Sequence, residues 1–147
     1  MHITSYQPRY RDDMIFCLLL AKDALGAAPR LNEDLLDVQL NYLDQGEGFW
    51  LALNEKDRVI GMVGTRTGAK NEIWLKRLYV KPEYKRQGVA SALYLTAEDF
   101  VRAKGVLRVH TRFKDDYHEA AQFYHAMGFS ETRRSADCRH FVKELVT

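Results

Sequence analysis

A short basic segment around Gly88 stands between an expected strand and an expected helix, and its residue types suit anion binding. The first turn of a helix has backbone N–H groups without intrahelical partners and carries the positive end of the helix dipole, so it binds phosphate oxygens well. Gly88 has no Cβ and lets the backbone come close to such an anion. Lys85 and Arg86 add cationic donors beside it. The segment is therefore a candidate pyrophosphate site.

A simpler explanation has equal weight on these residues alone, because one glycine with basic neighbours often does no more than begin a helix with a solvated charged face. Two classes of nucleotide site are excluded by the pattern. The chain has no Gly-x-x-x-x-Gly-Lys-Ser/Thr loop and no Gly-x-Gly-x-x-Gly within a strand–helix–strand unit.

The surrounding pattern predicts the elements that position this segment. Two helices are expected early in the chain, over Tyr10–Leu25 and from an Asn32 cap to about Asp44, separated by the loose stretch 26–29. The strongest helical period runs over Val89–Ala103, and a later helix is expected after a capping box at Asp116–Glu119. Strands are expected at His2–Tyr6, Phe49–Leu53, Val59–Thr67, Glu72–Val80, Val106–Thr111, Phe129–Arg134 and Arg139–Leu145, with polar turns at 54–57 and 67–70.

This order of elements predicts the fold class. It fits an α/β (α+β) protein with a central mixed, mostly antiparallel sheet and helices on both faces. The 147 residues show no repeat or linker and match one domain that covers residues 1–147.

Composition and net charge limit the classes of binding partner that the protein can have. Lys and Arg number 22 against 20 Asp and Glu, and a net charge of +2 is too small for binding to nucleic acid to be the main function. The apolar run Met14–Ala21 is too short for a membrane span. Cys17 and Cys138 lack metal or redox spacing, and the chain begins without a targeting pattern. We therefore expect a cytoplasmic protein with reduced thiols.

Two motifs carry a resemblance to a known family. The segment LYVKPEYKRQGVASAL resembles the acetyl-CoA motif of the GNAT N-acetyltransferase superfamily, Arg/Gln-x-x-Gly-x-Gly/Ala, with Lys85 at the first position. The segment AAQFYHAMGF, residues 120–129, is similar to the family's late helix with its aromatic–tyrosine pair followed by Gly-Phe. Both motifs stand in the family's order, and the expected elements follow the GNAT acyl-CoA N-acyltransferase fold along the whole chain. The resemblance implies an acetyl-CoA-dependent N-acetyltransferase.

The resemblance also implies where acetyl-CoA, the co-substrate, binds. It would lie where the strand ending at Val80 splays away from the next strand in the chain, with free backbone groups hydrogen-bonding the pantetheine arm. The pyrophosphate would sit on the amides of residues 86–91. Tyr117 replaces an asparagine that contacts the pantetheine region in many relatives, so its hydroxyl is the expected substitute. The expected cofactor-binding residues are Leu78, Tyr79, Val80, Lys85, Arg86, Gln87, Gly88, Val89, Ala90, Ser91 and Tyr117.

The implied reaction is direct attack of a primary amine on the thioester. An alkylamine has a pKa near ~10.4 and a thiol near ~8.5, so a base and an acid are needed. Tyr124 matches the family tyrosine near the sulfur and is the expected acid; alternatively it is a core aromatic on an apolar helix face. Glu72 is the candidate base, because strand alternation puts it on the face of Leu78 and Val80, toward the cleft. A water chain, with Glu72 as a solvated charge, is the alternative.

The acceptor is expected to be a small-molecule or peptide amine. Acidic side chains between Leu25 and Glu47 would favour a cationic amine, although a solvated helix face explains them as well. No metal is expected, because the histidines lack ligand spacing and the family needs none. A homodimer is one option, as in many relatives. The competing function is a non-catalytic acyl-CoA-binding module, which would keep the phosphate site without a role for Tyr124.

Overall fold

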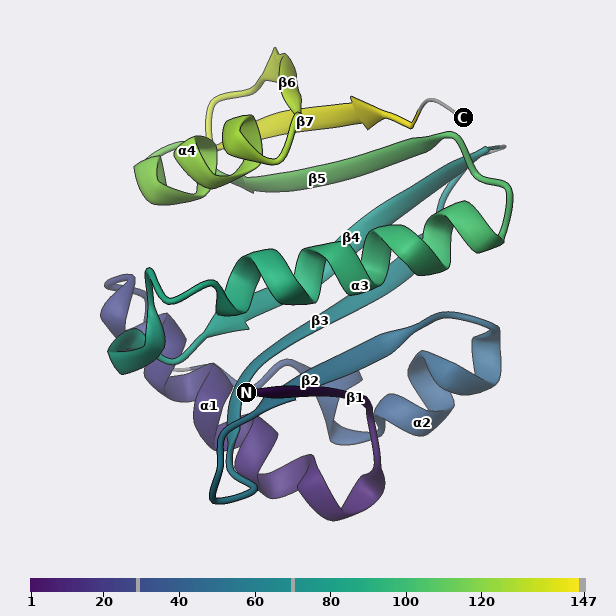
Figure 1. Ribbon diagram of the computed structural model, residues 1–147. Helices are drawn as coiled ribbons and strands as arrows, with labels where there is room; N and C mark the ends of the chain where they lie inside the picture. Colours follow the sequence, from purple (N-terminus) through teal and green to yellow (C-terminus); the bar gives the residue numbers. More distant parts are fainter. Residues whose placement is uncertain (29, 70, 146–147) are drawn as a thin grey trace.

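The computed structural model describes residues 1–28, 30–69 and 71–145. Pro29 and Lys70, which fall in the expected loop 26–29 and turn 67–70, and residues 146–147 lie outside the described residues. Within those ranges seven strands form one sheet in the order β1-β2-β3-β4-β5-β7-β6 (Figure 1). The strands are β1 (His2–Ser5), β2 (Phe49–Leu53), β3 (Val59–Thr67), β4 (Glu72–Val80), β5 (Arg108–Lys114), β6 (Ser130–Arg134) and β7 (Cys138–Glu144).

Helices cover both faces of the sheet. Their bounds are α1 (Arg11–Ala24), α2 (Val38–Asn41), α3 (Val89–Ala103) and α4 (His118–Ala126), with short 3-10 turns η1 (Pro8–Tyr10), η2 (Glu33–Leu36), η3 (Leu43–Gln45) and η4 (Pro82–Tyr84). One buried cluster joins α3 and α4 to the sheet, and a second joins α1 and α2 to its other face. The predicted fold class, a mixed sheet flanked by helices on both faces, is confirmed.

The sheet is antiparallel except where β4 meets β5, and that parallel contact is short. Only three residue pairs join the two strands: Glu72 with Arg108, Ile73 with Val109, and Trp74 with His110. Beyond Trp74 the strands diverge toward the end of the sheet where α3 begins and α4 lies, which Figure 1 shows between the teal and green strands. Backbone groups of β4 on that side therefore have no strand neighbour in β5.

A β-bulge changes the direction of the side chains along β4. Tyr79 pairs with Met62 of β3 and Lys76 pairs with Gly64, so β4 carries one more residue than β3 between these pairs. Arg77 lies in the bulge with φ +59°, a left-handed conformation that costs a non-glycine residue about 1–2 kcal/mol. As a result, Ile73 and Leu75 share the α3 face with Leu78 and Val80, whereas Tyr79 packs on the α1 face.

Two expected helical features are wrong. The region from Asn32 to Asp44 forms short separate turns, and Asp37 caps α2 by accepting the Leu40 N–H at 3.0 Å. The Asn32 side chain instead accepts a hydrogen bond from Lys22 Nζ. The expected capping box at Asp116–Glu119 does not form either, since the N-cap of α4 is Tyr117 without a side-chain cap. The Glu119 carboxylate is drawn toward the cationic segment before α3.

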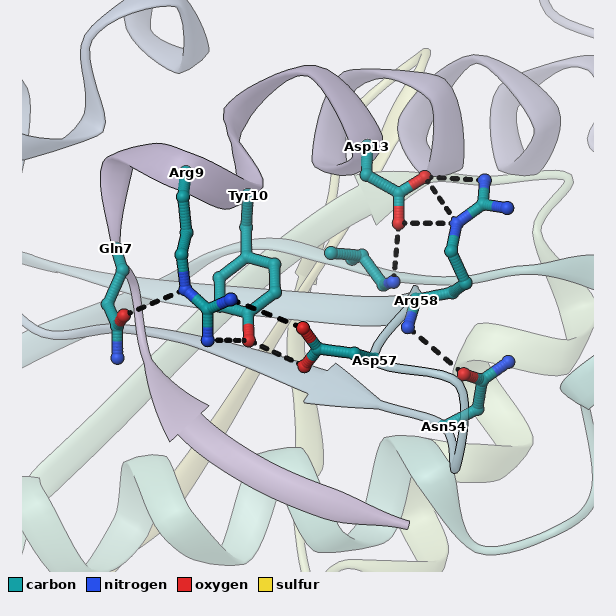
Figure 2. A network of polar contacts seen from close by, with 8 residues as sticks. Gln7, Arg9, Tyr10, Asp13, Asn54, Asp57 and Arg58 are labelled. Atoms are coloured by element: carbon teal, nitrogen blue, oxygen red, sulfur yellow. Dashed lines mark hydrogen bonds and ion pairs between the residues drawn. The ribbon is translucent and has the colours of Figure 1, made fainter.

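Carboxylates fasten α1 to the turn between β2 and β3 (Figure 2). Asp13 accepts hydrogen bonds from two nitrogens of Arg58, from Nε to both carboxylate oxygens at 3.1 Å and from Nη2 at 2.8 Å, and one from the Val59 N–H at 2.7 Å. The Arg58 side chain is the main cause that lowers the pKa of Asp13, against the opposing effect of burial. The Tyr10 hydroxyl donates to Asp57 at 2.6 Å. These bonds hold the beginning of α1, whose other end reaches the gap between β4 and β5.

Candidate active site

A cleft of about 1020 Å³ opens where β4 and β5 stop pairing. Its strand walls include Leu78, Tyr79 and Val80 from β4 and Thr111 and Phe113 from β5, while α3 and α4 contribute their first turns. The splay leaves the edge of β4 open to an extended ligand, which could take the place of a neighbouring strand. The cleft therefore has the shape and the hydrogen-bonding edge for a long, narrow molecule.

The N-terminus of α3 stands at this cleft and suits an anion. Gly88 is its N-cap with φ +84°, and no side chain caps the helix. A Cβ at Gly88 would meet no atom within 4 Å, so the space beside the backbone is open. Lys85 and Arg86 also line the cleft, and both pair with Glu119 of α4, at 3.5 and 3.4 Å. Free N–H groups and two cations therefore fit the pyrophosphate of a coenzyme A thioester.

The structure brings most of the sequence-predicted site residues to this cleft. Gln87 is an exception, because its side chain turns back and donates to the Glu83 carbonyl at 3.0 Å. The predicted residues that line the cleft are Leu78, Tyr79, Val80, Lys85, Arg86, Gly88, Val89, Ala90, Ser91, Tyr117 and Tyr124.

Tyr124 is held in the wall of the cleft by aromatic packing. Its ring stacks on Phe113, with 5.6 Å between centroids, and meets Phe129 edge-on at 5.1 Å. The side chain is 6% exposed. Burial raises the pKa of Tyr124 to about 12, against a smaller lowering by a hydrogen bond with Thr111. The phenol therefore stays protonated at neutral pH and is able to donate a proton or a hydrogen bond into the cleft.

Glu72 lies elsewhere, and the expectation that it points toward the cleft is contradicted. Its Oε1 is 3.4 Å from His110 Nε2 and 3.8 Å from a guanidinium nitrogen of Arg108, at the end of β4 that is paired with β5. The bulge is the physical reason, because it places Leu78 and Val80 on the face opposite Glu72. Among the described residues of β4, none that lines the cleft is a carboxylate.

The acidic residues expected near an acceptor hold the fold together instead. Asp34 accepts two hydrogen bonds from Arg77, at 2.9 and 3.1 Å, and one from the Tyr42 hydroxyl. Glu47 is buried and accepts from the Thr65 hydroxyl and a backbone N–H. Asp34 and Glu47 therefore have partners within the chain.

Four cations on the walls of the cleft were missed by the sequence reasoning: Lys22, Arg77, Arg112 and Lys114. Arg112 and Lys114 lie beyond the predicted strand Val106–Thr111, whereas β5 continues to Lys114. No sequence pattern predicted that Arg77 lines the cleft, because its position depends on the bulge in β4.

A second, shallower hollow of about 600 Å³ lies over α1 and the β2–β3 turn. Its polar side chains form hydrogen bonds with one another (Figure 2); they belong to Arg9, Tyr10, Asp13, Asp57 and Arg58. Few of their hydrogen-bonding groups are therefore left for a ligand. In the described part of the chain, no helix is long and apolar enough to cross a membrane, and no three His, Cys, Asp or Glu residues gather as metal ligands.

Comparison with known proteins agrees with this geometry. Residues 14–129 match the model of the acetyltransferase (GNAT) family. The chain is 34% identical over 111 residues to human N-acetyltransferase 8, a match that covers 71% of this chain and 48% of the relative. It is 32% identical over 113 residues to the probable N-acetyltransferase camello of Xenopus tropicalis, covering 74% and 51%. The chain thus spans about half the length of these curated relatives.

Solved structures share the whole architecture. An acetyltransferase of the GNAT family from Staphylococcus aureus superposes with a TM-score of 0.87 at 22% identity and covers 99% of both chains. The PaiA N-acetyltransferase of Thermoplasma acidophilum, solved in complex with coenzyme A, gives 0.79 at 21% identity, over 98% of this chain and 99% of that one. The fold of the chain is the fold of these acetyltransferase structures. The chain belongs to the GNAT acetyltransferase family.

Proposed function

We propose that this protein transfers the acetyl group of acetyl-CoA to a primary amine. The observation that carries the proposal is the gap between β4 and β5 beside the open N-terminus of α3. The proposal is also supported by the family to which the chain belongs and by relatives that are named N-acetyltransferases.

The binding mode follows from the edges that the cleft exposes. The β4 backbone at Leu78, Tyr79 and Val80 would pair with the amides of the pantetheine arm, as a strand pairs with its neighbour. The N–H groups of residues 86–91 would hold the pyrophosphate, with Lys85 as a further donor. Tyr117 is the N-cap of α4 and lines the cleft, and its hydroxyl would contact the pantetheine region.

In the reaction, the amine nitrogen attacks the thioester carbonyl, a C–N bond forms and the C–S bond breaks. Tyr124 donates a proton or a hydrogen bond to the departing thiolate, a role that suits a buried, protonated phenol. The amine must also lose a proton before it attacks. With Glu72 outside the cleft, water in the cleft mouth is the proposed carrier of that proton.

The natural acceptor belongs to the class of small-molecule or peptide amines. Among the structural relatives are an aminoglycoside 6′-N-acetyltransferase and a ribosomal-protein-S18-alanine N-acetyltransferase, which act on these two kinds of amine. A cytoplasmic location and a homodimer remain predictions from the sequence.

The test combines thermal unfolding with an acetyl-transfer assay. Acetyl-CoA at a hundred times its Kd should add about 2.7 kcal/mol and raise Tm by about 5–10 °C. Gly88→Asp should abolish that rise, because a carboxylate there repels the pyrophosphate. Gly105→Asp is the matched control, since Gly105 also has a positive φ, +72°, with open space around it, but lies at the other end of α3.

The outcomes separate binding from catalysis. A Tm rise in the parent and in Gly105→Asp, with acetylated product from an amine panel, supports the proposal. A Tm rise without any product, across a broad amine panel, would favour the non-catalytic acyl-CoA-binding module. No Tm rise at saturating acetyl-CoA would refute both.

A further inference from the structure

The α1 side of the cleft is lined by cations from three elements. Lys22 comes from the last turn of α1, Arg77 from the bulge in β4, and Arg112 and Lys114 from the diverging end of β5. These residues are far apart in the sequence, and the splay brings them to one cavity. The cleft therefore has a positive wall in addition to the positive segment at α3.

Little negative charge balances this wall. The carboxylate of Asp34 is engaged by both Arg77 and the Tyr42 hydroxyl. Lys22 donates to neutral oxygens, the Asn32 side chain and the Arg30 carbonyl. Burial lowers the pKa of Lys22, the charges of Arg77, Arg30 and Lys114 lower it further, and the charge of Asp34 opposes them in part.

Two acidic residues of the described ranges line the cleft, Glu119 in the first turn of α4 and Asp116, two residues after Lys114 in the chain. Glu119 pairs with Lys85 and Arg86, and the remaining carboxylate, Asp116, is exposed just before α4. Among the described residues, Arg112 and Lys114 are exposed and form no ion pair. A ligand with a negative group would supply the missing charge.

We infer that the acceptor amine carries a carboxylate, as an α-amino acid does, and that Arg112 and Lys114 bind this group. The inference rests on the proposed acetyl transfer and specifies its substrate class. The proposed site of the co-substrate's pyrophosphate is at Gly88, Lys85 and Arg86, so the second group of cations is available to the other substrate. Guanidinium and ammonium groups are the usual partners of carboxylates in proteins.

The test uses two acceptors that differ in one charge. Phenylalanine and phenylalaninamide share an apolar body, which Ala24 and Leu25 in the cleft wall can contact. We would measure kcat/KM for each with saturating acetyl-CoA, in the parent and in Arg112→Gln, Lys114→Gln and Lys56→Gln. Lys56 is an exposed turn residue outside the cleft and serves as the control. The two acceptors differ in intrinsic reactivity, and this difference cancels when the preference of each variant is divided by the preference of the parent.

The parent should favour the carboxylate acceptor on the order of tenfold. Arg112→Gln and Lys114→Gln should each reduce that preference roughly threefold to fivefold, with Lys56→Gln unchanged. Raising the salt concentration should reduce the preference in the parent as well. A preference that both cleft variants retain overturns the inference and leaves acetyl transfer standing. If acetyl-CoA binds but neither acceptor is acetylated, the inference fails; failure across a broad amine panel also refutes the proposed function.

Discussion

Replacement of Tyr124 by phenylalanine removes one hydroxyl group and so tests the proposed acid. The ring contacts with Phe113 and Phe129 do not involve the oxygen, so packing is kept. The lost hydrogen bond with Thr111 should lower the free energy of unfolding by only about 0.5–1.5 kcal/mol. Loss of a general acid, in contrast, should lower kcat by about 10²-fold or more. A large change in rate with a small change in stability is therefore expected.

The pH dependence gives a second readout. With a pKa of about 12, the Tyr124 phenol stays neutral through the range in which amines lose their protons. The parent's kcat should therefore rise with pH as the amine deprotonates, without an alkaline decrease below roughly pH 11. Since the folded-state pKa lies above the value of 10 for an unfolded tyrosine, the stability linked to this group is present below pH 10 and lost as pH rises through 12.

The matched control is Tyr94→Phe. Tyr94 is another buried tyrosine, whose hydroxyl donates to Glu98 at 2.7 Å, and it is not among the described residues that line the cleft. Steady-state kinetics over pH and urea unfolding of both variants would be compared. If Tyr124→Phe kept the parent's kcat at every pH, or lost no more than Tyr94→Phe, the acid role would be refuted.

Two further predictions concern the ion pairs. Glu119→Gln frees its two cationic partners in the segment before α3, so the KM for acetyl-CoA should fall roughly twofold to fivefold in steady-state assays; an unchanged or higher KM would contradict this. Asp13→Asn breaks the contacts with Arg58 and should lower the free energy of unfolding by about 1 kcal/mol in urea, a value reduced by the half-exposed guanidinium. Because Arg58 lowers the pKa of Asp13, the parent's advantage should be complete above about pH 4 and disappear as pH falls through that lowered pKa. An advantage that does not decrease at any acidic pH would argue against the ion pair.

The sequence alone was sufficient for the features that depend on neighbouring residues. Pro82, Gly88 and the period after Val89 predicted a strand, a basic turn and a helix, and the structure has β4 and α3 within the predicted bounds. Gly88 adopts the positive φ that its residue type allows. Such features follow from backbone preferences and from the spacing of apolar side chains, and both can be read from residues that are close together in the sequence.

The tertiary structure decided what those elements present to the cleft. Arg77 occupies the bulge although it is not a glycine, so the residue type did not predict the positive φ. The one extra residue places Glu72 on the face of β4 opposite Leu78 and Val80. Lys22 and Lys114 line the same cleft only because α1 packs on β4, from which β5 has diverged. Both outcomes depend on contacts between segments that are distant in the chain, so alternation along a single strand cannot predict them.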